Sequence, residues 1–112
     1  MITAEEIDAL FGRSRDSLLT ELGGAGLDVF PRSLLQRGAD TYKAIRESLR
    51  ETICRDPRVI QLREDETHKP ELVAAIADIV ASSTVGIPPF TVAVLILRDG
   101  LPRFCATYWH DN

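Results

Sequence analysis

The sequence predicts an all-α fold, and three observations support this expectation. The chain has 112 residues, of which 45% are apolar and 27% are charged, a balance typical of soluble globular domains. Apolar side chains recur at helical spacing over most of the chain. Proline and glycine stand at the places where helices are expected to begin and end. We therefore expect a single domain over residues 1–112, a compact orthogonal bundle of four to five helices.

The first helix is predicted over residues 4–22. Thr3 and Glu6 have the spacing of a capping box, in which a hydroxyl and a carboxylate satisfy free backbone N–H groups. A stripe of apolar residues then follows the helical period: Ile7, Leu10, Phe11, Leu18 and Leu22. Gly12 is a weak point that favours a kink, and the glycine-rich run 23–26 ends the helix.

The second helix is predicted from Pro31 to Cys54, because proline suits a first helical turn and Asp56-Pro57 prevents continuation. A break near Gly38 is an alternative, with Asp40 as a new N-cap. The polar side of this helix is sorted by charge. Its basic flank carries Lys43, Arg46 and Arg50, and its acidic flank carries Asp40, Glu47 and Glu51.

A short helical turn over residues 59–62 and a third long helix from Pro70 complete the central part of the chain. Residues 79–97 then carry no charge over 19 positions, which is nominally long enough to cross a membrane. Polar residues 82–84 and the run 86–89, which contains Pro88 and Pro89, interrupt this stretch. We therefore predict two buried elements joined by a turn, and no membrane span.

The last segment fits two structures. Residues 91–97 suit a buried strand or a buried helix, because periodicity does not separate the two. Asp99-Gly100 is a hairpin signal, so the alternative fold is α+β with a C-terminal β-hairpin at about 91–109. We favour a helix that starts at Pro88 or Pro89 and ends at Gly100, followed by a short final helix from Pro102.

No catalytic signature is recognisable, and we expect neither enzymatic activity nor a cofactor. Two cysteines, Cys54 and Cys105, do not form a disulfide framework. With His68 and His110 they lack the spacing of a zinc site, so no metal site is predicted. Of the two thiols, we expect that of Cys54 to be the more reactive, because arginines lie nearby in the sequence. A reducing, cytoplasmic location follows from the low cysteine count and the acidic N-terminus.

The charge distribution carries the functional prediction. The net charge is −4, but residues 32–63 contain eight basic and four acidic side chains and lie between two acidic segments. A small protein-interaction or regulatory module, acting through helix surfaces, is the function we expect. Its predicted partner-binding residues are Lys43, Arg46, Arg50 and Trp109.

Two other functions and one assembly state stay open at this point. The arginine-rich segment 32–63 suits a nucleic-acid-binding protein, although nucleic acid is the less favoured partner because the whole chain is acidic. A small thiol enzyme or redox protein centred on Cys54 is the other alternative. Self-association as a homodimer is also expected, through a patch of apolar residues outside the main stripes: Leu19, Val29, Phe30 and Trp109.

Overall fold

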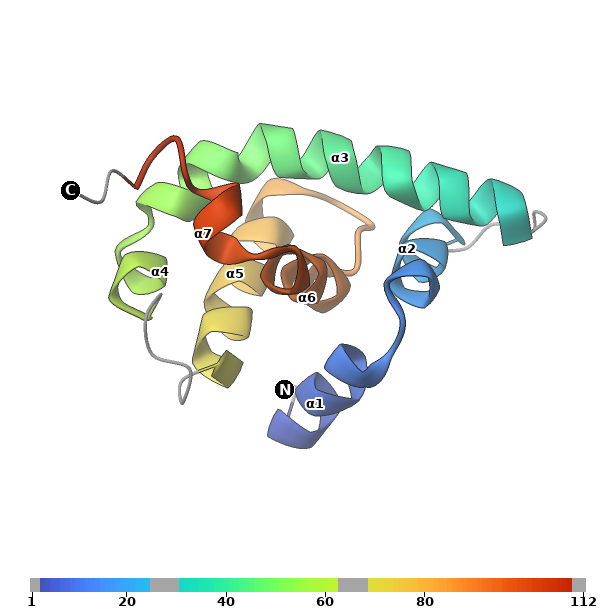
Figure 1. Cartoon of the computed structure of the whole chain (residues 1–112), viewed down its shortest axis with the longest axis horizontal. Helices are drawn as coiled ribbons and strands as arrows, with labels where there is room; N and C mark the ends of the chain where they lie inside the picture. Colours follow the sequence, from blue (N-terminus) through green and yellow to red (C-terminus); the bar gives the residue numbers. More distant parts are fainter. Residues whose placement is uncertain (1–2, 25–30, 63–68, 110–112) are drawn as a thin grey trace.

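The computed structural model describes residues 3–24, 31–62 and 69–109, and within these ranges its regular structure is helical (Figure 1). The helices are α1 (Ala4–Gly12), α2 (Arg15–Gly24), α3 (Pro31–Arg55), α4 (Pro57–Leu62), α5 (Lys69–Ser83), α6 (Pro89–Asp99) and α7 (Leu101–Phe104). The all-α prediction is confirmed, and the alternative of a β-hairpin at 91–109 is wrong. The described ranges hold seven helices rather than four to five, because one expected helix is split and two are short.

The expected helix over 4–22 is two helices, because the chain is extended at Arg13. This residue has φ −81° and ψ 151°, which ends α1. Ser14 then starts α2 by accepting a hydrogen bond at its Oγ from the backbone N–H of Ser17, over 3.0 Å. A side-chain cap one residue after the extended residue separates the two helices.

The longest helix, α3, runs without interruption through Gly38, so the alternative of a break there is wrong. A regular helix of 25 residues is about 37 Å long, and α3 spans most of the molecule's long dimension of 46 Å (Figure 1). Its N-terminal half lies along α2, and its C-terminal end leads directly into α4. Asp56 marks this junction by accepting a hydrogen bond from the backbone N–H of Arg58, over 2.8 Å.

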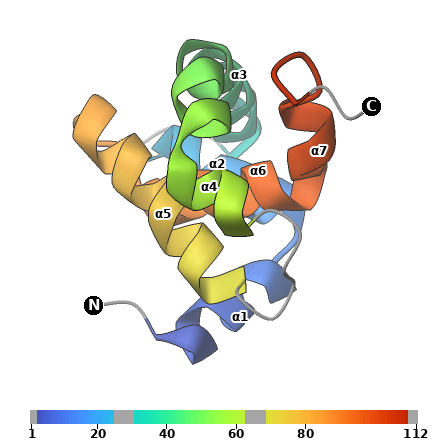
Figure 2. The ribbon, with the colours of Figure 1, turned by 90° about the vertical axis from the view of Figure 1, so that its left-hand side faces the viewer.

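The core is centred on α6, which lies between α5 and α7 (Figure 2). Six consecutive residues of α6, from Thr91 to Ile96, are buried, which explains why this segment has no polar face in the sequence. The alanines of α5 let it pack closely, and Ala75 and Ala77 are both buried. The third long helix expected from Pro70 corresponds to α5, and its larger apolar residues are all buried: Leu72, Val73, Ile76, Ile79 and Val80.

The uncharged stretch at residues 79–97 is divided as predicted. It consists of the end of α5, a turn, and α6, whose first residue is Pro89 and which is capped by Gly100 at φ 104°. Among the described residues, every helix is too short or too polar to cross a bilayer.

Candidate anion-binding pocket

A cavity of about 480 Å³ opens where α2, α3, α6 and α7 meet. Among the described residues that line it, half are arginines and one, Asp99, is a carboxylate. The lining consists of Arg15, Tyr42, Arg46, Arg50, Ile96, Arg98, Asp99, Gly100, Arg103 and Phe104. Its formal charge of +4 contrasts with the net charge of −4 of the whole chain. The pocket therefore concentrates positive charge in an otherwise acidic protein.

Asp99, the last residue of α6, organises one side of the pocket. Its carboxylate accepts two hydrogen bonds from the guanidinium of Arg15, over 3.1 and 3.2 Å, and one from the hydroxyl of Tyr42, over 2.8 Å. Arg15 and Arg46 also lie against the Tyr42 ring, with guanidinium carbons 5.7 and 5.5 Å from its centroid. These contacts join the start of α2, the middle of α3 and the end of α6, and they hold two arginines in place.

The same contacts shift the pKa values of all three groups. The hydrogen bond to Asp99 raises the pKa of Arg15. Burial, helped by the hydrogen bond to the carboxylate, raises the pKa of Tyr42. Burial also acts to raise the pKa of Asp99, but the hydrogen bonds from Arg15 and Tyr42 and the arginine charges outweigh it, so this pKa lies below its usual value. At neutral pH, Asp99 is therefore a carboxylate and Tyr42 is a neutral hydrogen-bond donor.

Arg46 and Arg50 are less completely paired than Arg15. The nearest carboxylate oxygen to Arg46 belongs to Asp99, at 4.0 Å, and Arg50 reaches Glu47 only at 3.4 Å. The Nε atoms of both arginines are buried and have no hydrogen-bond partner among the residues that the structure describes. Because the Nε atoms are enclosed by protein, the donors that these arginines offer to the cavity are their terminal guanidinium nitrogens. Those of Arg50 donate to Glu47 over 3.4 Å.

The remaining arginines of the pocket come from its C-terminal wall. Arg98 donates to the backbone carbonyl of Arg13. Arg103 on α7 is exposed, and its guanidinium has no hydrogen-bond or ion-pair partner among the residues that the structure describes. Arg50 lies over the ring of Phe104, with its guanidinium carbon 5.3 Å from the centroid. The wall thus combines unpaired positive charge with an apolar surface.

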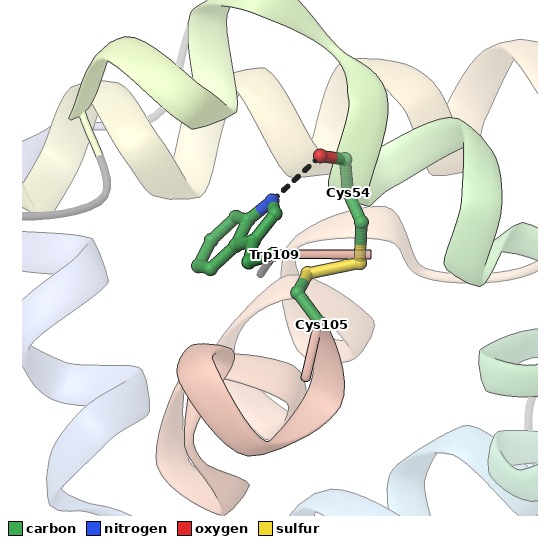
Figure 3. The surroundings of a disulfide bond; sticks show 3 residues. All are labelled: Cys54, Cys105 and Trp109. Atoms are coloured by element: carbon green, nitrogen blue, oxygen red, sulfur yellow. Dashed lines mark hydrogen bonds between the residues drawn. A yellow bond between two sulfur atoms is a disulfide. The ribbon is translucent and has the colours of Figure 1, made fainter. Parts of the chain in front are cut away.

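The structure brings together only part of the predicted partner-binding set. Arg46 and Arg50 line the pocket, whereas Lys43 is exposed and is not a lining residue. Trp109 also lies outside the lining. Its indole Nε1 donates to the backbone carbonyl of Cys54 over 2.7 Å (Figure 3), and its ring packs against the core.

Three pocket arginines escaped the sequence analysis: Arg15, Arg98 and Arg103. They belong to segments whose net charge is negative, so a sum of charges over each segment does not reveal them. The usable signal was local. Arg98 and Asp99 immediately precede the glycine that ends α6, and Arg103 follows it within one turn, so the three side chains had to lie near one helix end.

The two cysteines form a disulfide, Cys54–Cys105, between the end of α3 and the residue after α7 (Figure 3). Cys54 is 1% exposed and Cys105 is fully buried. The expectation of an exposed, reactive thiol at Cys54 is therefore wrong. The two residues are separated by 51 positions in sequence, and only the return of α6 and α7 along α3 brings them together.

Two other predictions concern residues that are only partly described. His68 and His110 lie outside the described residues, and within the described ranges no group of three or more histidine, cysteine or acidic side chains is arranged for a metal ion. Leu19 is 2% exposed, so it belongs to the core and not to a surface patch. Val29 and Phe30 lie outside the described residues, and homodimer formation stays a prediction.

Comparisons of this chain with protein-family models, with curated proteins and with solved structures gave no match.

Proposed function

We propose that this protein is an interaction module that binds an acidic segment of a partner protein through the arginine pocket. The observation that carries the proposal is the excess of arginine over carboxylate in the cavity lining. Guanidinium groups bind carboxylates in a two-pronged geometry and keep their charge at any physiological pH. Of the groups that an unmodified peptide carries, an acidic side chain complements this lining.

The arrangement of the arginines also supports binding rather than mere solvation. Charged residues on a helix usually point into solvent and form weak pairs. Here Arg46 and Arg50 are half-buried, lie one turn apart on α3 and border a cavity. A carboxylate that entered the cavity would pair with the terminal guanidinium nitrogens of Arg46, whose ion pair with Asp99 is stretched to 4.0 Å, and this gain is available only in the complex.

A pair of matched double variants tests the proposal. Arg46→Gln with Arg50→Gln removes two charges from the pocket. Arg37→Gln with Lys43→Gln removes two charges from exposed positions of α3 outside the lining. Both variants lower the net charge equally, so they separate the pocket from general electrostatic attraction.

Fluorescence anisotropy with labelled peptides of 12 residues, rich in aspartate and glutamate, provides the readout. We expect binding by the wild type and by the Arg37/Lys43 variant, and a loss of at least about tenfold in the Arg46/Arg50 variant, since buried charge pairs contribute about 2 kcal/mol or more. Equal loss in both variants would contradict a role of the pocket. Tight binding of mixed oligonucleotides in place of the peptides would instead favour a nucleic-acid partner.

A cytoplasmic location, which the sequence predicts, belongs to the same proposal and has its own test. Thiols are kept reduced in the cytosol, whereas disulfides persist in oxidising compartments, so the Cys54–Cys105 disulfide of the structure weighs against this location and makes the test decisive. Acid quenching of cells followed by alkylation with a mass-tagged maleimide reports the state of Cys54 and Cys105. Free thiols support a cytoplasmic location, and a stable disulfide in the cell would contradict it.

A further inference from the structure

The number of positive charges around the pocket exceeds what a single carboxylate neutralises. Five guanidinium groups and the carboxylate of Asp99 line the cavity, and Glu47 approaches Arg50 from outside the lining. A carboxylate ligand adds one negative charge, whereas a phosphate monoester adds about −1.5 to −2 at neutral pH. The charge balance of the pocket therefore favours a ligand group with two charges.

The unpaired hydrogen-bond donors of the pocket also favour a ligand group with two charges. Arg46 on α3 and Arg103 on α7 supply them: the ion pair of Arg46 with Asp99 is stretched to 4.0 Å, and Arg103 has no partner among the described residues. Arg50 donates to Glu47 over 3.4 Å and adds positive charge beside them. A carboxylate offers two oxygens in one plane, whereas a phosphate monoester offers three oxygens in a tetrahedral arrangement. Clusters of arginine are a recurrent means of binding phosphorylated motifs.

The cavity also has room for the group that carries the phosphate. Its volume of about 480 Å³ falls within the range of small-molecule pockets, which is about 300–1,000 Å³. Ile96 and Phe104 supply an apolar wall beside the arginines. This combination fits an apolar stem that ends in a charged head.

We propose that the arginine pocket selects a phosphate monoester in its doubly charged form over a carboxylate. The inference deepens the proposed function, on which it rests, by naming the acidic group that the pocket binds. The monoester is either a phosphorylated side chain of the partner protein or a small phosphate ester. The two sources share one chemistry and differ in how they respond to the peptide experiments below.

The first experiment compares three small probes that share a phenyl ring: phenyl phosphate, phenyl sulfate and benzoate. Phenyl sulfate keeps the tetrahedral head but carries one charge, and benzoate has one charge and a planar head. We expect isothermal titration calorimetry at pH 7.5 to show binding of phenyl phosphate at least about tenfold tighter than that of either other probe. Equal binding of the three probes, or no binding of phenyl phosphate, would overturn the inference.

The pH dependence separates the doubly charged form from the singly charged form. The second pKa of a phosphate monoester is about 6, so affinity for phenyl phosphate should rise about tenfold between pH 5 and pH 7.5. The groups that face the site do not change charge in this range. The arginines stay protonated, Tyr42 stays neutral, and the pKa of Asp99 is already below its usual value. Glu47 contacts Arg50 from outside the lining. A flat pH profile for phenyl phosphate would contradict binding of the doubly charged form.

Variants place the binding in the pocket. Arg46→Gln with Arg50→Gln should abolish phenyl phosphate binding, and the Arg37→Gln, Lys43→Gln control should leave it unchanged. Because Arg50 also contacts Phe104, the exposed Arg103→Gln serves as a second variant that does not disturb packing, and we expect it to weaken binding several-fold. The Nε–H signals of Arg46 and Arg50 in ¹⁵N NMR spectra should shift on titration. Unshifted signals, or equal weakening in the control, would overturn the assignment to the pocket.

Peptide arms distinguish the sources and separate this inference from the proposed function. An acidic peptide is compared with versions in which one serine is unmodified, phosphorylated or replaced by glutamate. Tighter binding of the phosphorylated version supports a phosphorylated partner. Equal binding of the phosphorylated and glutamate versions overturns the inference and leaves the proposed function standing. Binding of phenyl phosphate without binding of any peptide supports a small phosphate ester and contradicts the proposed function.

Discussion

Asp99 shows how one carboxylate holds a set of positive charges together. It accepts hydrogen bonds from Arg15, which lies 84 positions away in sequence, and from Tyr42, 57 positions away. Without Asp99 the start of α2 would be repelled by the arginines of α3. The same carboxylate lowers the positive charge of the pocket by one, so it stabilises the fold and weakens anion binding at the same time.

Asp99→Asn should therefore reduce stability and change its dependence on pH. A carboxyl group whose folded-state pKa is depressed contributes stability that is present above its ordinary pKa of about 3.9 and is lost as the pH falls through the folded value. We expect the wild type to lose the contribution of this group to its free energy of unfolding as the pH falls from about 5 through the folded pKa of Asp99.

Urea unfolding followed by circular dichroism across this pH range measures the effect. The Asp99→Asn variant should show a shallower decline, and the part that remains includes Asp56, whose pKa a hydrogen bond from Arg58 lowers. Superimposable profiles for the variant and the wild type would show that Asp99 is not held as described. The same variant should bind anions more tightly, because the pocket loses its one internal competitor.

At the scale of the helices, the crossing of α2 and α3 depends on two glycines. A Cβ atom added at Gly38 would lie 1.7 Å from the backbone oxygen of Leu19, and one added at Gly23 would lie 2.0 Å from the backbone oxygen of Leu34. Backbone atoms cannot move aside as the end of a side chain can. The two helices therefore approach each other closely only because both positions lack a side chain.

Gly38→Ala should destabilise the protein by about 2–3 kcal/mol or more, because α2 and α3 must separate to accept the methyl group. Gly12→Ala is the matched control. Nothing lies within 4 Å of a Cβ atom at Gly12, and alanine is the better helix former by about 0.5–1 kcal/mol. Thermal unfolding should thus move in opposite directions for the two variants. A neutral Gly38→Ala would mean that the close crossing is absent.

At the scale of the whole molecule, the disulfide ties the C-terminal segment to the end of the longest helix. Cys105 follows α7, and Trp109 covers the bond from the outside by donating to the carbonyl of Cys54 (Figure 3). Phe104, beside Cys105, lines the arginine pocket. The covalent link therefore also holds one wall of the candidate site.

Cys54→Ser with Cys105→Ser should lower the free energy of unfolding by about 2–4 kcal/mol, since the loop closed by the bond spans 51 positions and its constraint on the unfolded chain is lost. Guanidinium chloride unfolding of the wild type with and without a reductant should reproduce the difference. A variant that unfolds at the same denaturant concentration as the oxidised wild type would show that the bond does not constrain the fold. Anion binding by a folded variant should weaken, because the wall that contains Phe104 is no longer tied down.

Much of the helical architecture could be predicted because it is encoded by neighbours in sequence. Pro31 and Pro89 begin helices, Gly100 ends one, and the apolar spacing from Leu72 to Val80 marks a buried face. These signals act within one or two helical turns, where backbone geometry leaves few choices. The kink expected at Gly12 is a full break one residue later, because Arg13 is extended and Ser14 caps α2.

Only two of the pocket arginines, Arg46 and Arg50, could be predicted from the sequence. Arg46 and Arg50 stand one turn apart on one helix, so their spacing alone groups them. Arg15, Arg98 and Arg103 join them through packing between distant segments, and no local period reports such contacts.

By itself, the sequence determined the fold class, most helix ends and the apolar faces, because each depends on interactions between residues a few positions apart. Only the tertiary structure decided that Cys54 meets Cys105, that Gly38 meets Gly23, and that five arginines surround one cavity. Some of these contacts join residues more than 80 positions apart in the sequence. They form only after the helices have packed around the core. Local propensity sets the helices, and burial of their shared apolar surface sets which of their polar residues become neighbours.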